Sequence, residues 1–188
     1  VLTLIVLAAE RLLARAPAST QGRRRLAVGL VAVAVAACGL GSIRRNATYR
    51  SPLAMWRDVV AKRPENPRGH LYLGNALSDL GRHEEAEASF REALRRKPSY
   101  AKAHGNLGNA LVMQGRLEEG IRSYEEALRL DPAFVQAHIN FGVALVRQGR
   151  LEEAIPHYLE AIRLQPGAAV AHNNLGFAFF KQGRLEEA

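Results

Sequence analysis

Apolar and small residues recur with a helical spacing along two adjacent segments near the middle of the chain. In residues 101–114 and again in residues 117–130 they fall close to the 3.6-residue period that places side chains on one face of an α-helix. Gly115 separates the two segments, and glycine accepts the left-handed conformation with which many helices end. Pro132 follows the second segment and cannot continue a helix. The pattern predicts two helices that a short connection makes antiparallel neighbours.

This pair returns every 34 residues from residue 67 onward. The recurring positions include His at 70, 104, 138 and 172, Gly at 81, 115, 149 and 183, and Pro at 98, 132 and 166. A fixed period of this length indicates an array in which each helix pair buries its apolar face against its neighbours. The period and the residues resemble the tetratricopeptide repeat (TPR) family, with His where that family often has Trp. The resemblance implies an all-α solenoid of antiparallel helix pairs.

The period divides the array into repeats. Residues 67–100, 101–134 and 135–168 form three full repeats, and residues 169–188 form a partial fourth that is truncated in its second helix. Residues 51–64 begin with Ser-Pro, a helix-start signal, and match the second helix of a repeat. We expect this degenerate half-repeat to cap the array, because terminal repeats must cover an otherwise open apolar face.

The charge of the chain lies outside the array. The formal net charge is +8, but residues 67–188 contain 15 Lys or Arg and 15 Asp or Glu and are therefore neutral. The whole excess belongs to residues 1–66. Because the repeats lack a basic stripe with interleaved aromatic residues, we expect no nucleic-acid partner.

The basic N-terminal part flanks apolar segments. Residues 26–43 are uncharged between arginine clusters, and 18 residues in a helix reach about 27 Å, enough for a bilayer core. We therefore expect a transmembrane helix at 26–43 that contacts the lipid bilayer, preceded by the end of another transmembrane segment at 1–13 and a basic loop at 14–25. A buried soluble helix is the alternative. The slight arginine bias of the loop places the repeats outside the cytoplasm, at a bacterial inner membrane.

Two further features of the N-terminal part bear on its role. Cys38 follows Val-Ala-Ala, which is similar to a bacterial lipoprotein cleavage box, so a TPR lipoprotein anchored at Cys38 is an alternative. The junction at 49–77, and with it roughly residues 1–80, resembles bacterial relatives of the transmembrane and TPR-containing O-mannosyltransferases. That resemblance implies a multi-spanning glycosyltransferase with the repeats as its substrate-recruiting C-terminal tail. The start at Val1 inside an apolar run and the truncated fourth repeat lead us to expect a fragment at both ends.

A second stripe on the first helix of each repeat faces away from the packed face. In TPR arrays this face lines a concave groove that holds peptides, and the groove residues expected here are Arg68, Tyr72, Asn75, Lys102, Asn106, Asn109, Met113, Asn140, Arg147, Asn174, Phe177 and Lys181. The asparagine column 106, 140 and 174 resembles the asparagine ladder of the O-linked N-acetylglucosamine transferase superhelix, where amides hold a ligand's backbone. A solvated polar face is the alternative. Apolar members favour a partly apolar protein or peptide ligand.

Nothing in the repeats indicates catalysis, a cofactor or a metal. The four aligned histidines are one repeat apart, roughly 10 Å, and cannot share a zinc ion that needs ligands at about 2 Å. The paired glutamates of each second helix lie in its first turn, where the helix dipole favours anions. The sequence therefore predicts a non-catalytic, membrane-anchored TPR scaffold for protein–protein interaction.

One column of the array departs from its neighbours. Gly120 lies where Ala86, Ala154 and Ala188 stand in the other repeats, inside an unbroken helical pattern. Glycine in a helix interior costs about 0.5–1 kcal/mol relative to alanine. The sequence therefore predicts that Gly120→Ala stabilises the array, unless the two helices of this repeat approach unusually closely.

Overall fold

The structure is a computed structural model that describes residues 28–29, 32–33 and 51–183 of the chain. The chain divides into two compact units, residues 1–51 and 52–188, which we treat separately. In the first unit the described residues 28–29 and 32–33 are helical. Most of residues 1–13, 14–25 and 26–43 lie outside the described residues. Among the residues that are described, no helix combines the length and the apolar character needed to cross a membrane.

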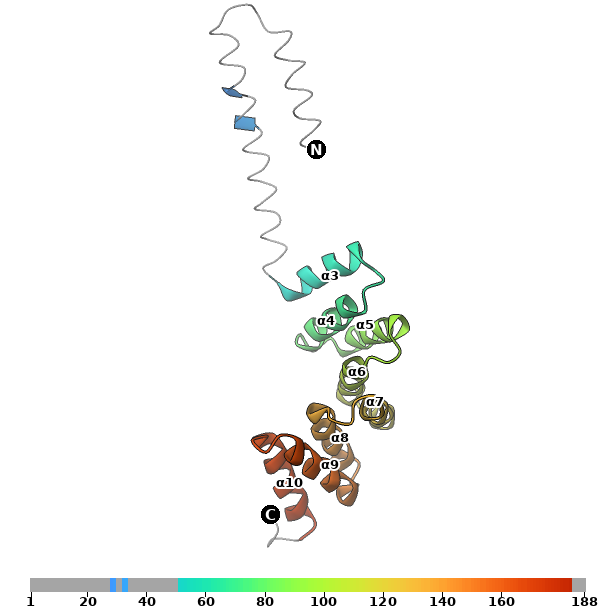
Figure 1. Ribbon diagram of the computed structural model, residues 1–188, viewed down its shortest axis with the longest axis vertical. Coiled ribbons are helices and arrows are strands. Elements are labelled where there is room, and N and C mark those ends of the chain that lie inside the picture. The colour runs from blue at the N-terminus through green and yellow to red at the C-terminus, as the bar shows by residue number, and fades with distance from the viewer. Residues whose placement is uncertain (1–27, 30–31, 34–50, 184–188) are drawn as a thin grey trace, which may run out of the picture. The chain divides into compact units, whose positions relative to one another are not determined.

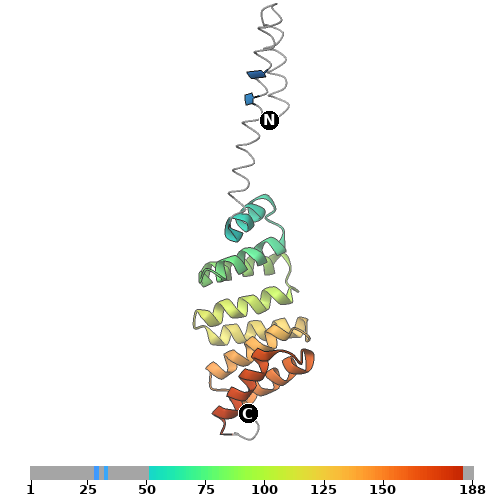
Figure 2. The ribbon, with the colours of Figure 1, turned by 90° about the vertical axis from the view of Figure 1, so that its left-hand side faces the viewer.

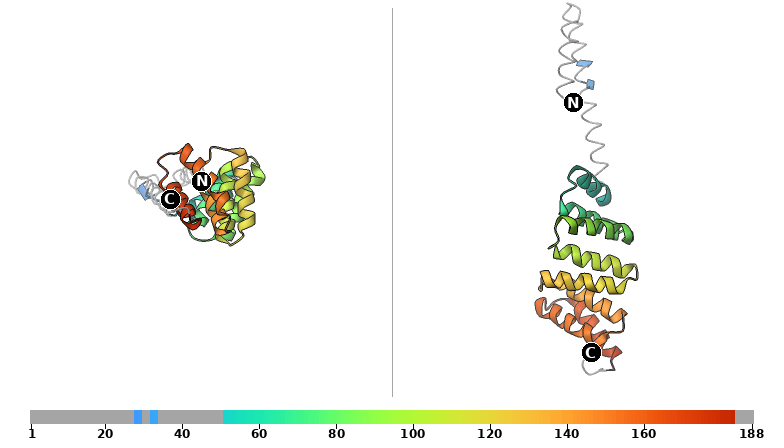
Figure 3. Two further views of the ribbon diagram at one scale, coloured as in Figure 1. Left: turned by 90° about the horizontal axis from the view of Figure 1, so that it is seen from below. Right: turned by 90° about the vertical axis from the view of Figure 1, so that its right-hand side faces the viewer.

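The second unit is a stack of helices that follow one another in chain order (Figures 1 and 2). Their bounds are α3 (Pro52–Lys62), α4 (Pro67–Ser78), α5 (His83–Arg96), α6 (Ala101–Met113), α7 (Leu117–Leu130), α8 (Val135–Arg147), α9 (Leu151–Leu164) and α10 (Ala169–Lys181). Each helix packs against the next, so α4–α5, α6–α7 and α8–α9 form the three expected pairs. Residues 51–183 contain no strand. The right-hand view of Figure 3 shows the same layers from the side opposite to that of Figure 2.

The turn inside each repeat is built around a glycine with a left-handed backbone. Gly115 has φ +82°, which L side chains rarely adopt. Its N–H donates to the carbonyl of Val112 at 3.1 Å, and the N–H of Arg116 donates to Leu111 at 3.0 Å. This pair of bonds is the Schellman motif, which satisfies the last carbonyls of α6 and reverses the chain into α7. The predicted helix stop at Gly115 is confirmed.

An aromatic side chain from each second helix packs against a glycine of the first helix. Tyr124 is 1% exposed, and a Cβ built on Gly108 would lie only 2.7 Å from its ring and 3.0 Å from the Gly120 carbonyl oxygen. Ala127, one turn further along α7, is fully buried. The small residues of these columns therefore allow α6 and α7 to approach closely.

The structure overturns the expectation that Gly120→Ala is stabilising. A Cβ at Gly120 would stand 2.5 Å from Cγ2 of Val112 and 3.0 Å from the carbonyl oxygen of Gly108. Val112 is β-branched and cannot easily rotate away inside a helix. The alanines of the neighbouring repeats misled the prediction, because α6 and α7 meet through glycine on both helices.

Each aligned histidine joins its helix to the preceding connection. The Nε2 atoms of His70, His104, His138 and His172 lie 2.8, 2.9, 3.0 and 3.0 Å from the carbonyl oxygens of Pro64, Pro98, Pro132 and Pro166. Because a carbonyl only accepts, each Nε2 carries the proton and donates it. The histidine column therefore ties the loop between repeats to the first helix that follows.

A polar contact between successive second helices adds to the apolar packing. Arg116, at the start of α7, donates to Glu87 of α5 at 2.7 Å, and Gln114 donates to the same carboxylate at 3.0 Å. Burial, the largest single influence on Glu87, favours its protonated form, yet hydrogen bonds from Gln114 and Arg91 and the charge of Arg116 leave its pKa lowered. Glu87 is thus held as an anion between two repeats.

Candidate peptide-binding groove

The first helices of the repeats line the inner side of the stack. The helices α4, α6, α8 and α10 contact one another across successive repeats, in addition to packing against their own second helices. Direct contact between first helices places them on the side where the repeats converge. The stripe predicted from the sequence therefore lies along this concave face.

The largest hollow on the concave face has a volume of about 1170 Å³. It is formed by α4, α6, the start of α8 and the connections between them. The predicted groove residues that line it are Arg68, Tyr72, Asn75, Lys102 and Asn106. Trp56 of α3 stacks on Tyr72 with ring centroids 4.6 Å apart, so the capping helix fixes one wall of the groove.

The asparagines of the groove form bonds across the repeats. The side-chain amide of Asn106 donates to Oδ1 of Asn75 at 2.7 Å, and that of Asn140 donates to Oδ1 of Asn109 at 2.8 Å. Each of these bonds joins the first helix of one repeat to that of the next. Within α8, Gln136 donates to Oδ1 of Asn140 at 2.8 Å. This face is therefore ordered by its own polar network.

A buried tyrosine fixes one member of this network. The hydroxyl of Tyr124 donates to Oδ1 of Asn109 at 2.5 Å. Burial raises the pKa of Tyr124 well above its usual value, with a smaller opposing effect of the Arg147 charge. The hydroxyl therefore stays protonated and acts as a donor that orients Asn109.

Five groove residues escaped the sequence analysis because they lie in the connections between helices rather than on the helical stripe. These are Asn66, Lys97, Ser99, Tyr100 and Phe134. Tyr100 is half-buried, and its pKa is raised by burial and by proximity to Tyr72, against an opposing effect of Arg68. The ammonium of Lys97 lies 5.1 Å from the Tyr100 ring centroid. The aromatic residues at 100 and 134, one period apart, were the available signal.

The charge of the groove differs from that of the neutral array. Its charged lining residues are Arg68, Lys97 and Lys102, and its lining contains no carboxylate. Tyr72, Tyr100 and Phe134 supply aromatic surface beside them. The groove is therefore cationic and aromatic, with amides across its floor.

The remaining predicted residues lie further along the concave face and do not line the 1170 Å³ hollow. Asn109 and Asn140 belong to the amide network, Met113 and Arg147 are exposed, and Asn174 is half-buried on α10. The ammonium of Lys181 lies 5.6 Å from the ring centroid of exposed Phe177. Val143 stands where Asn75 and Asn109 stand in earlier repeats, so the amide pairing cannot extend to Asn174.

The described residues contain no group of three or more His, Cys, Asp or Glu side chains placed to hold a metal ion. His138 and His157 are close, with their Nδ1 atoms 3.1 Å apart, but the contact is a hydrogen bond between two rings.

The geometry of paired helices, glycine turns and a concave amide face agrees with the comparison of the chain with known families. The family model described as tetratricopeptide repeat matches residues 45–101, 73–133, 106–169 and 139–188. The chain belongs to the tetratricopeptide repeat family. These overlapping matches cover the whole helical stack. None of the curated proteins matches the chain.

Solved structures agree with this TPR fold. A crystal structure of MamA is 24% identical, with a TM-score of 0.66 over 72% of this chain and 79% of that one. A thermophilic TPR protein of Thermus thermophilus is 20% identical, with a TM-score of 0.63 over 72% and 75%. The first TPR of Spaghetti (RPAP3), bound to the HSP90 peptide SRMEEVD, is 19% identical, with a TM-score of 0.62 over 63% and 96%. Because these structures are only 19–24% identical to the chain, their likeness shows a shared fold alone.

The second resemblance drawn from the sequence finds no such support. Neither the family match nor these structures supports the likeness of residues 1–80 to O-mannosyltransferase-related membrane proteins. Of residues 1–80, the structure describes 28–29, 32–33 and 51–80.

Proposed function

We propose that this TPR array binds an extended segment of a partner protein in the groove lined by α4 and α6. The observation that carries the proposal is the row of bridged amides, Asn75 with Asn106 and Asn109 with Asn140, along the concave face. Each donating amide uses one N–H in the bridge and keeps a second N–H for other bonds. The carbonyl oxygen of Asn140 already accepts from Gln136 and keeps one further lone pair. Such groups match the alternating donors and acceptors of an extended peptide backbone.

The charge of the groove favours a segment with acidic side chains. Arg68, Lys97 and Lys102 surround the hollow, and no carboxylate of its lining opposes them. Tyr72 and Tyr100 offer apolar surface to a neighbouring aliphatic or aromatic side chain. The peptide complex of the Spaghetti TPR supports peptide binding as a use of this fold.

The amide row can be tested with a double variant. We expect Asn106→Ala with Asn140→Ala to weaken binding of a labelled acidic peptide such as SRMEEVD by about ten-fold, since each lost hydrogen bond costs about 0.5–1.5 kcal/mol. Calorimetry or fluorescence anisotropy measures the change. Arg163→Ala is the matched control, because Arg163 lies on α9 and pairs with Glu160.

Two results would contradict the proposal. The first is unchanged affinity in the double variant with an intact far-UV spectrum, which would assign the amides to solvent. The second is equal affinity for a peptide in which lysines replace the acidic residues, which would remove the role of the groove's charge.

We also propose that residues 26–43 attach the array to a membrane, with the repeats outside the cytoplasm. The support is the uncharged run of 18 residues between arginine clusters. The proposal concerns attachment only and adds no catalytic role to the repeats.

A further inference from the structure

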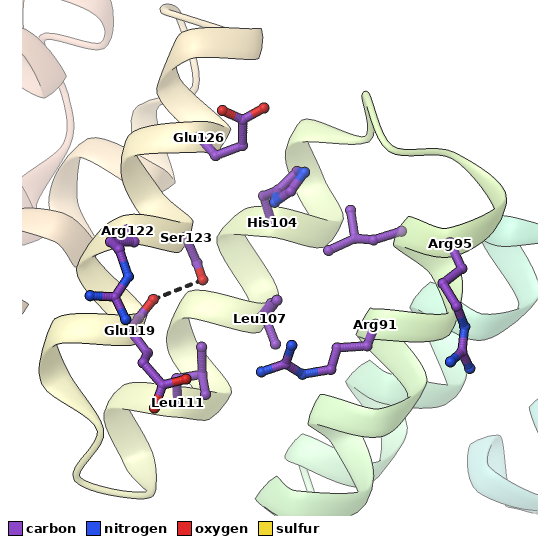
Figure 4. A pocket seen from close by; sticks show the side chains of 10 residues that line it. Arg91, Arg95, His104, Leu107, Leu111, Glu119, Arg122, Ser123 and Glu126 are labelled. Atoms are coloured by element: carbon purple, nitrogen blue, oxygen red, sulfur yellow. Dashed lines mark hydrogen bonds between the residues drawn. The ribbon is translucent and has the colours of Figure 1, made fainter.

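A second hollow lies on the outer side of the stack, between the second helices α5 and α7 (Figure 4). We call it the outer cleft; its volume is about 610 Å³. Its apolar lining is the half-buried Leu94 with the buried Leu107 and Leu111 beneath it, and the polar side chains around it are Arg91, Arg95, His104, Glu119, Arg122, Ser123 and Glu126. None of these residues lines the concave groove.

The equivalent place one repeat later is occupied by a side chain of the protein itself. His157 of α9 stands 34 residues after Ser123, and its ring lies over Phe141 with centroids 4.2 Å apart. Its Nδ1 is 3.1 Å from Nδ1 of His138. Ser123 has no ring at the position from which His157 reaches Phe141 and His138 in the next repeat.

The outer cleft retains the partner that His157 uses in the next repeat. His104 corresponds to His138, and each donates from Nε2 to a proline carbonyl. A neutral ring that donates from Nε2 has a free lone pair on Nδ1. In His138 this atom is bonded to His157, whereas in His104 no residue of 51–183 bonds to it. His104 thus presents an unused acceptor to the outer cleft.

The charges around the outer cleft leave one cation without a direct partner. Glu119 is bound by Arg116, Glu126 by Arg129, and Arg91 by Glu87. Arg95 is paired with Glu92.

That cation is Arg122. It forms no hydrogen bond or ion pair with any residue of 51–183, although its charge helps to lower the pKa of Glu119 after the larger effect of Arg116. Proline stands at the equivalent position 156 in the next repeat. A guanidinium at this position is therefore present in the outer cleft but not at the equivalent place beside His157.

We propose that the outer cleft binds an acidic segment of a partner protein that inserts a histidine ring where His157 lies in the following repeat. The ring donates an N–H to Nδ1 of His104 and packs beside the half-buried Leu94. A carboxylate beside the inserted histidine pairs with Arg122. This site lies on the opposite side of the stack from the concave groove and is independent of the peptide that the groove holds.

The probe for this proposal is a fluorescein-labelled peptide, acetyl-Glu-Asp-His-Asp-Glu-amide, titrated with the 188-residue chain and followed by anisotropy. We expect this peptide to bind at least about ten-fold more tightly than the peptide with alanine for histidine, because the second peptide loses both a hydrogen bond and ring packing. A histidine peptide flanked by lysines should bind more weakly still, since its charge opposes Arg122.

Three variants locate the site. Ser123→His reproduces the side chain of the next repeat and should abolish binding by filling the outer cleft, without lowering the melting temperature. Ser123→Ala, its matched control, should bind within about two-fold of the native chain, since it leaves the cleft open. Arg122→Ala should weaken binding several-fold, whereas the groove variant Asn106→Ala with Asn140→Ala should leave it unchanged.

Equal affinities for the histidine and alanine peptides would overturn the proposal. So would native affinity in a folded Ser123→His variant, and so would a loss confined to the groove variant, which would place the peptide on the concave face. If Ser123→His does not fold, Arg122→Ala and the pair of histidine and alanine peptides decide alone. The site is refuted if the affinity is the same after either of these changes.

Discussion

Among single residues, Gly120 differs from the alanines of its column by one methyl group, and the structure predicts that adding it is harmful. The new Cβ would lie 2.5 Å from Val112 Cγ2, so we expect Gly120→Ala to destabilise the array by about 1–3 kcal/mol. Urea melts followed by circular dichroism measure the effect. An unchanged or higher midpoint would show that α6 and α7 separate without cost.

The neighbouring side chain supplies the control for this change. Val112→Ala removes the nearest obstacle, so the double variant Val112→Ala with Gly120→Ala should be less destabilised than the sum of the two single variants. The repeat before it has Ser78 and Ala86 at the equivalent positions, a pair in which the second helix already accepts a methyl group.

His157 makes the array sensitive to acid. Burial, and secondarily the charge of His138, lowers the pKa of His157 to about 4, below the ordinary value of about 6.5 expected in the unfolded chain. Between these values the unfolded state binds more protons, so the free energy of unfolding falls as the pH drops from 6.5 to 4 and levels off below that range. Allowing for partial exposure, we expect a loss of about 1–2 kcal/mol.

The measurement is the difference between urea midpoints at pH 7.5 and pH 5.0 for the native chain and for His157→Gln. The variant cannot take up this proton, so its midpoint should fall less than that of the native chain. Equal falls in the two proteins would assign the acid sensitivity to other groups.

At the level of the helices, the turn inside a repeat depends on glycine for its backbone conformation, whereas Gly69 inside α4 has room for a side chain. Gly115 has φ +82°, and alanine there should cost about 1–2 kcal/mol, because the left-handed conformation brings Cβ against the carbonyl oxygen. Gly69 in α4 is the matched control: a Cβ there would meet Val59 and Val60 at an ordinary 3.4 Å. Gly69→Ala should therefore be neutral or slightly stabilising in urea melts. Equal costs at the two positions would contradict the assigned turn.

For the molecule as a whole, the neutral array and the basic N-terminal part call for separate tests. We expect the 188-residue chain to remain in the membrane fraction after alkaline carbonate extraction, and deletion of residues 26–43 to release it, since this run is the longest uncharged stretch. Replacing residues 26–43 with an equally long apolar sequence is the control and should retain the chain. Release of the undeleted chain would refute attachment by a membrane span.

The period, the paired helices and the stripe that becomes the concave face could all be predicted from the amino-acid sequence. These follow from local causes: helical spacing, a glycine that ends the first helix and a proline that ends the second. Asn75 and Asn106 could be placed on one side of the array for a related reason, because a fixed repeat returns equivalent residues to equivalent positions.

The contacts between neighbouring repeats became visible only in the folded molecule. The bond from Asn106 to Asn75, the contribution of Tyr100 and Phe134 to the groove, and the imidazole of His157 opposite His138 depend on distances between separate helices. The contact of Gly120 with Val112 also depends on such a distance. The aligned alanines of the other repeats indicated room for a methyl group at this position, and the folded molecule leaves none. A periodic sequence shows which residues are equivalent. The spacing between two packed helices, however, depends on the side chains that both helices bring to their contact, and these side chains differ from one helix pair of this array to the next.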